Sequence, residues 1–347
     1  MGHNNRTMVS EQPCLIVLSI GHAHDLVQSA KVQSDFGLVK QIGQTILDQD
    51  EIIGDANDYH NLSVEFSRSD DYATAFQIVE KGLKQFPYNI DLLADAIYYG
   101  SNAKQYEKCE SYVEKLKSTP FARWNWRAFT FLVDYYLNKA DWTEDTTQLF
   151  GFTDKALDVA YAHQEILPNE EKGYLSEFKI RVLRERYYRA EKKLEEAETE
   201  SKLSEDVLKR AIESNEILAV QCCLRYADFL FEKQRYSEVI SVCDQALQYG
   251  ESQSSARLSY LLYLSGQSKD VLIHREKAFG DIARVQDVFS DYMAAYQDID
   301  GITFRNNIKT RSIILSAKSG VPLPEFLNDQ TDKNDSNISA LLQKMLK

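Results

Sequence analysis

Apolar residues recur along most of this chain at spacings of three, four and seven, which is the period of an amphipathic α-helix. The clearest example runs from Tyr59 to Pro87, where two such patterns are separated by the polar run Ser69-Asp70-Asp71. Asp is a favourable residue at the start of a helix because its carboxylate accepts hydrogen bonds from free backbone N–H groups. The pattern therefore predicts two antiparallel helices joined by a short turn.

The same pattern returns one period later. Tyr106, Cys109 and Val113 follow Tyr72, Ala75 and Val79, each by 34 residues. Small side chains at fixed places on both helices let paired helices approach closely. The preceding segment, 93–102, is the expected first helix of this second unit, although Ala96, Ile97 and Gly100 are less typical residues there.

Further units are predicted downstream with less regular spacing. Residues 129–136 and 156–168 predict a third pair, with Trp142 as the aromatic residue near its turn and an insertion over 143–151. Residues 187–197 and 236–247 repeat the second-helix pattern, and 223–230 predicts the first helix that precedes the latter. The wide gap between them predicts an insertion near 199–216, with an extra helix at 204–214.

The run Tyr59-x2-Leu62-Ser63-x2-Phe66, continued by Tyr72, Ala75, Val79 and Pro87, resembles the tetratricopeptide repeat, with Tyr in place of the usual Trp and Ser in place of Gly. The resemblance implies an all-α fold, a right-handed α-solenoid of stacked antiparallel helix pairs with irregular capping helices. The expected parts are an N-terminal segment and helical cap (1–58), helix pairs (59–250), C-terminal helical pairs or a cap (251–327), and a flexible tail with a short amphipathic helix (328–347).

The resemblance also implies a function. Members of this family usually bind a protein or peptide, without catalysis, in a concave groove lined by first helices. In the present register that face carries Asn57, His60, Val64, Arg68, Asp91, Ala94, Tyr98 and Asn102. Some relatives hold a carboxyl-terminal peptide with Lys and Asn, but His60 and Val64 stand at the comparable positions here, so that particular clamp is not expected.

Three further segments leave alternatives open. The aromatic cluster around Trp124 and Arg127 predicts either core packing between pairs or exposed anchors, since Trp and Arg are frequent binding hot spots. The charged stretch 181–202 predicts an ion-paired, solvated helix face or a basic site for an acidic ligand. The terminal anchors Leu341, Leu342 and Met345 predict a flexible tail, a packed last helix, or a peptide that docks on another molecule.

Composition and charge narrow the classes of partner. With 14 Gly and 6 Pro among 347 residues, helix breakers are scarce. A net charge of −13 argues against nucleic acid or an anionic membrane as the main partner. The stretch from Cys14 to Ile20, which is apolar except for Ser19, is too short to span a bilayer. A soluble, cytoplasmic protein is expected, and a homo-oligomer is left open as one of its states.

Candidate chemistry is sparse. The sequence has no phosphate-binding loop, nucleophile elbow or zinc-protease motif, and His22-x-His24 lacks further ligands. The adjacent Cys222 and Cys223 predict one core and one half-exposed thiol, because successive helix residues point about 100° apart. No catalytic residue, cofactor or metal is predicted. Two alternatives to an adaptor are a peptide-responsive regulator whose superhelix tightens on binding, and an enzyme with scattered catalytic residues.

Overall fold

The computed structural model describes residues 18–49, 53–214, 216–248, 255–299 and 302–324. Within these ranges the chain forms fifteen α-helices and one 3-10 segment, and no strand. The helices are α1 (Ile20–Val32), α2 (Phe36–Asp48), α3 (Ala56–Ser67), α4 (Tyr72–Gln85), α5 (Ile90–Asn102), α6 (Tyr106–Lys117), α7 (Trp126–Trp142), α8 (Thr146–Ile166), α9 (Glu171–Ala190), α10 (Leu194–Ser214), α11 (Glu216–Glu232), α12 (Tyr236–Gln248), α13 (Ser255–Glu276), α14 (Ile282–Asp298) and α15 (Ile302–Ser319). The short segment η1 covers Phe121–Arg123.

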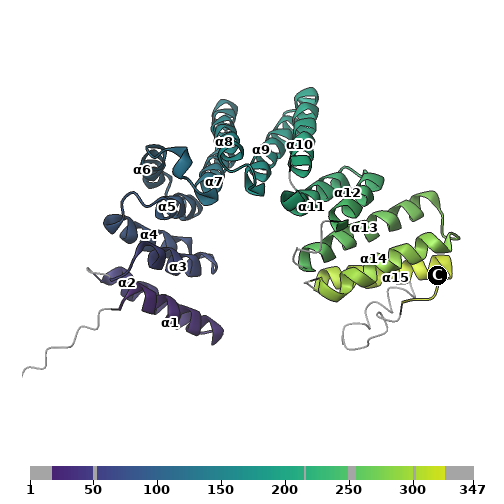
Figure 1. Ribbon diagram of the computed structural model, residues 1–347, viewed down its shortest axis with the longest axis horizontal. Coiled ribbons are helices and arrows are strands. Elements are labelled where there is room, and N and C mark those ends of the chain that lie inside the picture. The colour runs from purple at the N-terminus through teal and green to yellow at the C-terminus, as the bar shows by residue number, and fades with distance from the viewer. Residues whose placement is uncertain (1–17, 50–52, 215, 249–254, 300–301, 325–347) are drawn as a thin grey trace, which may run out of the picture. The chain divides into compact units, whose positions relative to one another are not determined.

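The chain divides into two units, residues 1–166 and 167–347. In unit 1, consecutive helices form antiparallel pairs that stack side by side (Figure 1). The first helices α1, α3, α5 and α7 contact one another in sequence and form one layer, and α2 contacts α4 on the other side. In unit 2, α9/α10, α11/α12 and α13/α14 pair in the same way. The prediction of an all-α fold made of stacked helix pairs is confirmed.

Six of the pairs share one turn conformation. The residue at the turn has a left-handed φ between 54° and 62° in each case: Ser34, Asp70, Lys104, Lys192, Gln234 and Lys277. The next N–H donates to the carbonyl five residues back, as Asp71 does to Phe66 (3.1 Å) and Gln105 to Gly100 (2.8 Å), which closes the first helix. In five of the six pairs the second helix then begins one residue further on, as at Tyr72 and Tyr106, whereas α14 begins later, at Ile282. The predicted equivalence of these two tyrosines is confirmed.

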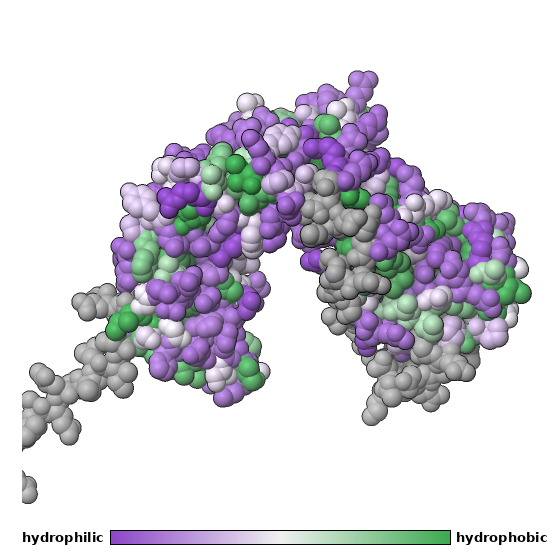
Figure 2. Space-filling view, viewed as in Figure 1, coloured by the Kyte–Doolittle hydropathy of each residue, from purple (hydrophilic) through white to green (hydrophobic). Residues whose placement is uncertain are grey.

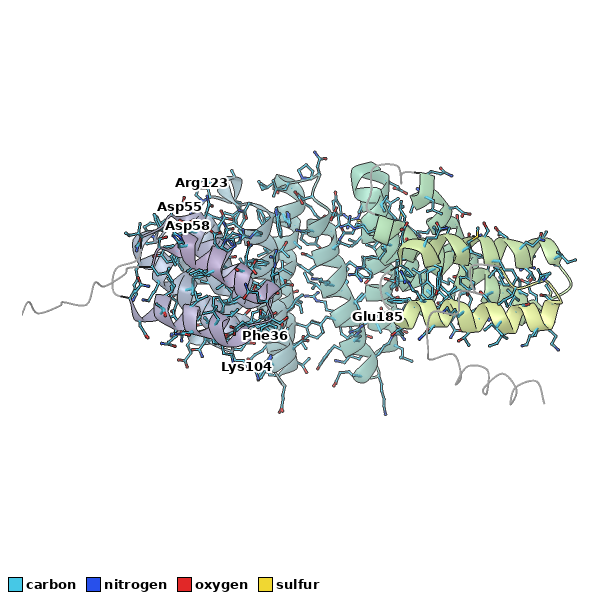
Figure 3. The ribbon with its side chains drawn as sticks, turned by 90° about the horizontal axis from the view of Figure 1, so that it is seen from below. Phe36, Asp55, Asp58, Lys104, Arg123 and Glu185 are labelled. Carbon is cyan, nitrogen blue, oxygen red and sulfur yellow. The ribbon has the colours of Figure 1, made fainter. Side chains whose placement is uncertain are left out.

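Figure 3 shows the two edges of unit 1 that these turns create. Phe36 and Lys104 lie at the edge where first helices turn into second helices, and Asp55 and Arg123 lie at the opposite edge.

Replacing Lys192 with Gly is expected to stabilise the chain by about 0.5–1 kcal/mol. A side chain in the left-handed region costs roughly 1–2 kcal/mol in the folded state. Gly removes most of this cost, but it also gives the unfolded chain more conformational entropy, which offsets part of the gain in stability. The matched change Lys202→Gly, at an exposed position inside α10, is expected to destabilise by roughly 0.5–1 kcal/mol. Thermal unfolding followed by circular dichroism checks both, and a lower melting temperature for Lys192→Gly would refute the strain argument.

The buried motif residues pack as the pattern predicts. Tyr59, Leu62, Ser63 and Ala75 are fully buried, as are the corresponding residues of other pairs: Cys109, Phe129, Leu132, Ala156, Ala160, Cys223, Ala227, Leu230, Val239, Cys243 and Ala246. The surface is different: hydrophilic residues cover most of the visible face of each unit, and hydrophobic residues occur there as separate patches (Figure 2).

The third pair departs from the predicted turn. Helix α7 continues to Trp142, so Trp142 ends a first helix and does not follow a turn, and residues 146–151 belong to α8. The cause is local, because the carboxylate of Asp145 accepts from the N–H groups of Thr147 (2.8 Å) and Gln148 (3.4 Å) and starts the new helix there. Trp142 is 60 % exposed and lies under the Lys104 ammonium at 4.4 Å.

The predicted register of residues 187–197 is wrong. Tyr187 lies in the first helix α9, the turn falls at Lys192, and Leu194 starts the second helix α10. The expected extra helix at 204–214 is the second half of α10, which has 21 residues. The wide sequence gap therefore comes from longer helices in an ordinary pair.

The structure also describes the helices nearest the chain ends and the surroundings of the thiols. Residues 20–48 form a complete pair, α1/α2, with the same turn as the repeats, and α13/α14 form another. Cys222 and Cys223 are both fully buried, which corrects the expected half-exposed thiol, and burial raises the pKa of each to about 12. Cys14, the tail 328–347 and the anchors Leu341, Leu342 and Met345 lie outside the described residues.

Candidate functional site

The predicted partner-binding residues lie on the first helices of unit 1 and differ in exposure. Asn57, Arg68 and Asn102 are exposed, Ala94 is buried, and the remainder are half-buried: His60, Val64, Asp91, Tyr98 and Arg127. The structure brings several of them together, because α3, α5 and α7 lie next to one another.

An ion cluster joins these three helices. Arg127 of α7 donates through Nη2 to Asp95 Oδ1 of α5 (2.5 Å), and Asp95 Oδ2 lies 2.7 Å from His60 Nδ1 of α3. Asp95 is fully buried. His60 Nε2 lies 3.1 Å from Arg127 Nη1, and His60 Nδ1 lies 2.8 Å from Arg127 Nη2. These side chains are occupied with one another and hold the first helices in register.

Asp91 completes the edge of this cluster. Its Oδ1 accepts from Asn125 Nδ2 (2.7 Å) and lies 3.4 Å from Arg127 Nη1. Asn125 also caps α7, since its side-chain oxygen accepts from the N–H groups of Arg127 and Ala128, both at 3.1 Å. The same polar residue therefore starts α7 and aligns it on α5.

Trp124 is part of the core. It is 3 % exposed, its Nε1 donates to Thr119 Oγ1 (2.8 Å), and its ring packs on Phe121 and Phe129. The prediction of Trp124 as an exposed anchor is wrong, and the alternative of core packing is confirmed. The reason is that the segment before α7 packs against that helix, with the ring centroids of Phe121 and Trp124 at 5.9 Å and 5.1 Å from that of Phe129.

An aromatic platform lies beside the ion cluster. Tyr98 stacks on Phe131 with ring centroids 4.4 Å apart, and Trp126 meets Phe131 edge-on at 6.4 Å. All three side chains are half-buried. Burial raises the pKa of Tyr98 to about 12, so its hydroxyl stays neutral at physiological pH. Only Tyr98 of these three was among the predicted contact residues.

Unit 2 contains a groove whose residues were not among the predicted partner-binding residues. It has a volume of about 540 Å³ and runs over the first helices α9, α11 and α13. It is lined by Phe178, Val182, Glu185, Arg186, Arg189, Arg225, Asp228, Phe229, Glu232, Lys233 and Tyr260. The rings of Phe178 and Phe229 meet edge to face at 5.8 Å and supply apolar surface, and Glu185 on α9 is marked in Figure 3.

The charges of this groove largely neutralise one another. Glu185 lies 2.6 Å from Lys233 and 2.8 Å from Arg189; although burial raises the pKa of Glu185, these partners hold it below the ordinary value. Asp228 accepts from Tyr260 Oη (3.0 Å) and lies 3.8 Å from Arg225, while burial raises the pKa of Asp228. The groove therefore combines aromatic surface with a rim of paired charges.

The sequence carried a signal for this groove, but it was incomplete. Arg186 and Arg189 belong to the stretch 181–202, for which a basic ligand site was one of two alternatives. The solvated face that was the other alternative is only partly present, since Arg181, Glu185 and Glu200 are buried. The turn falls at Lys192, after Tyr187, and this position shows that Arg186 and Arg189 belong to a first helix.

Two classes of site have no candidate in the part of the chain that the structure describes. No group of three or more His, Cys, Asp or Glu side chains there is arranged to hold a metal ion. No helix in the described ranges combines the length and the hydropathy needed to cross a membrane.

Solved structures offer distant similarity. A thermophilic tetratricopeptide-repeat protein of Thermus thermophilus is similar over 59 % of this chain and 96 % of its own, with 17 % identity and a TM-score of 0.42. A tetratricopeptide-repeat protein of Parabacteroides merdae is similar over 86 % of this chain and 98 % of its own, with 12 % identity and a TM-score of 0.38. No family model matches the sequence, and no curated protein does.

The chain is an all-α protein of tetratricopeptide-like helix pairs. Because both TM-scores are below 0.5, this assignment rests on the pairs themselves: the recurrent turn, the 34-residue step from Asp70 to Lys104, and the burial of the motif residues. Stacks of this kind present long surfaces on which other proteins bind.

Proposed function

We propose that this chain is a non-catalytic adaptor that binds a protein partner, and that the groove of unit 2 holds a peptide segment of that partner. The observation that supports this most is the apolar wall of the groove, where the half-buried Phe178 and Val182 of α9 lie over the buried ring of Phe229 on the packed layer of first helices. Burying one large apolar side chain in such a place contributes about 1.5–3 kcal/mol, so removing that anchor from a bound peptide should weaken its affinity by roughly tenfold or more.

In this proposal the charged rim of the groove orients a bound peptide more than it attracts one. Glu185 and Asp228 already have cationic partners, so a ligand gains little from either carboxylate. Arg186 is exposed on the same face of α9 and is available to a polar group of the ligand. We therefore propose an apolar anchor as the main requirement, with polar groups that select its direction.

Unit 1 offers a second contact surface in this proposal. Asn57, Val64, Tyr98 and Asn102 keep exposed or half-exposed atoms on the first-helix face, beside the ion cluster. Arg68 is also exposed there, although Glu65 accepts from it at 2.8 Å. The cluster of His60, Asp95 and Arg127 holds this face in place, and the exposed side chains make the contacts.

The state of the buried thiols agrees with a non-catalytic role. A cysteine nucleophile needs a lowered pKa and access to solvent. Burial instead raises the pKa of Cys109, Cys222 and Cys223 to about 12, so these thiols remain protonated and enclosed.

The substitution Val182→Asp is expected to weaken peptide binding by about tenfold or more, equivalent to about 1.4 kcal/mol. Val182 is half-buried in the groove wall, and the new carboxylate would lie near Glu185 and remove apolar surface. Peptides are first selected from a random phage-displayed library on the purified chain. The best one is then labelled and titrated by fluorescence anisotropy.

The matched control is Leu203→Asp, which makes the same kind of change at an exposed position of α10, 36 % exposed and outside the groove. It should leave affinity within about twofold. Circular dichroism confirms that both variants stay folded. Failure to select any peptide, or equal weakening by both substitutions, would contradict the proposed groove.

A further inference from the structure

The second helices of unit 1 form a separate groove, on the layer opposite to the first-helix face. It has a volume of about 580 Å³ and is lined by residues of α2, α4 and α6: Leu47, Gln77, Glu80, Lys81, Leu83, Lys84, Tyr112 and Lys115. None of these residues belongs to the surfaces proposed above. The groove of α2, α4 and α6 is therefore a separate candidate site.

Two of its charged side chains are already engaged. Glu80 accepts from Tyr112 Oη (3.0 Å) and from Lys108 Nζ (3.4 Å). Lys81 donates to the carbonyls of Ile46 (3.1 Å) and Gln49 (2.6 Å) at the end of α2. These contacts tie neighbouring pairs together. Lys108 offsets the charge of Glu80, whereas Lys81 keeps its charge but has its ammonium held at the end of α2.

Lys84 and Lys115 differ from them. Both are exposed, and among the residues that the structure describes no carboxylate lies within 4 Å of either ammonium. Lys115 lies 5.5 Å from the Tyr112 ring centre. Both occupy the last turn of their helices, where a cation is favoured by the helix dipole. The helix dipole accounts for a cation at each of these two positions, but it does not account for the fact that both lysines border one groove.

The surface between these lysines is partly apolar. Leu83 is 6 % exposed, and Leu47 and Tyr112 are half-buried. A ligand that suits this surface carries carboxylates at its ends and an apolar residue between them. The net charge of −13 repels such a ligand at long range, so binding requires a local cationic site of this kind.

We propose that the groove of α2, α4 and α6 binds an acidic amphipathic peptide segment of a partner protein. Its carboxylates pair with Lys84 and Lys115, and its apolar side chain covers Leu47 and Leu83. This site is independent of the groove in unit 2. An adaptor with both sites holds two segments at once.

The test uses a fluorescein-labelled peptide with Glu and Leu at helical spacing, titrated onto the full chain by fluorescence anisotropy. The wild-type chain is expected to bind it, more weakly as NaCl increases, because screening weakens exposed charge pairs. The double variant Lys84→Glu/Lys115→Glu should weaken binding by about tenfold or more. A peptide in which Lys replaces every Glu should reverse the preference and bind the double variant better than the wild type.

Two control variants separate this site from other causes. Lys193→Glu/Lys202→Glu changes the net charge equally at exposed positions of unit 2 and should leave affinity within about twofold. Val182→Asp should have no effect here, which distinguishes this site from the unit 2 groove. A peptide with Ser in place of Leu should bind at least about tenfold more weakly. No binding to the wild type, retained binding to the Lys84/Lys115 variant, or equal weakening by the Lys193/Lys202 variant overturns the proposal.

Discussion

Replacing Arg127 with Met is expected to destabilise unit 1 by about 3–5 kcal/mol, the usual cost of removing one partner from a buried ion pair. Arg127 is 15 % exposed and supplies, among the described residues, the one permanent cation that contacts the fully buried Asp95. Met keeps most of the side-chain volume, so the expected loss comes from the unpaired carboxylate. Tryptophan fluorescence during urea unfolding measures it, since all 3 tryptophans lie in unit 1.

Arg68→Met is the matched control on the same face. Arg68 also pairs with a glutamate, Glu65 at 2.8 Å, but its side chain is 68 % exposed. Glu65 is buried but keeps the Lys31 ammonium at 3.0 Å when Arg68 is removed. The exposed guanidinium therefore contributes no more than about 1 kcal/mol, and this variant should unfold close to the wild type. Adding Asp95→Asn to Arg127→Met should recover part of the stability because it removes the buried charge. If Arg127→Met cost no more than Arg68→Met, the cluster would not hold α3, α5 and α7 together.

We expect the Gly100→Ala variant to be about 1–3 kcal/mol less stable than the Gly151→Ala variant. This difference is the usual cost of adding a methyl group to a packed core. A Cβ at position 100 would lie 2.5 Å from Cys109 Sγ and 2.8 Å from Phe76 Cε2, and both of those residues are buried. A Cβ at position 151 meets nothing within 4 Å. Both positions are helical, so the gain of about 1 kcal/mol in helix propensity applies to each and cancels in the comparison.

The same urea titration reports both glycine variants. Gly151→Ala should raise the unfolding midpoint above that of the wild type, whereas Gly100→Ala should lower it relative to Gly151→Ala. Combining Gly100→Ala with Cys109→Ala should cost less than the sum of the two single changes, because the shortest contact is then relieved. Additive costs would show that Gly100 does not mark the closest approach of α5 and α6.

Much of the helix pairing could be read from the sequence, because each side chain that packs within a pair recurs locally. Tyr59, Leu62, Ser63 and Ala75 share faces by spacing alone, and the 34-residue step to Cys109 fixed the next pair. The turns were harder to find. Their left-handed residues are Ser, Asp, Lys and Gln rather than Gly, so composition did not mark the turn at Lys192.

The candidate sites depended on packing between pairs, which local spacing does not encode. Asp95 meets Arg127 across 32 residues and His60 across 35, and only the side-by-side placement of α3, α5 and α7 makes these contacts possible. Helix length, loop path and side-chain reach together decide which charges become buried and which line a groove. The sequence by itself determined that helices pair and which face each pair buries, and the tertiary structure decided the lateral contacts. Residues about one repeat apart, such as Asp91 and Asn125 at 34 residues, are neighbours by period, but which of them meet depends on helix length, loop path and side-chain reach, which the period does not specify.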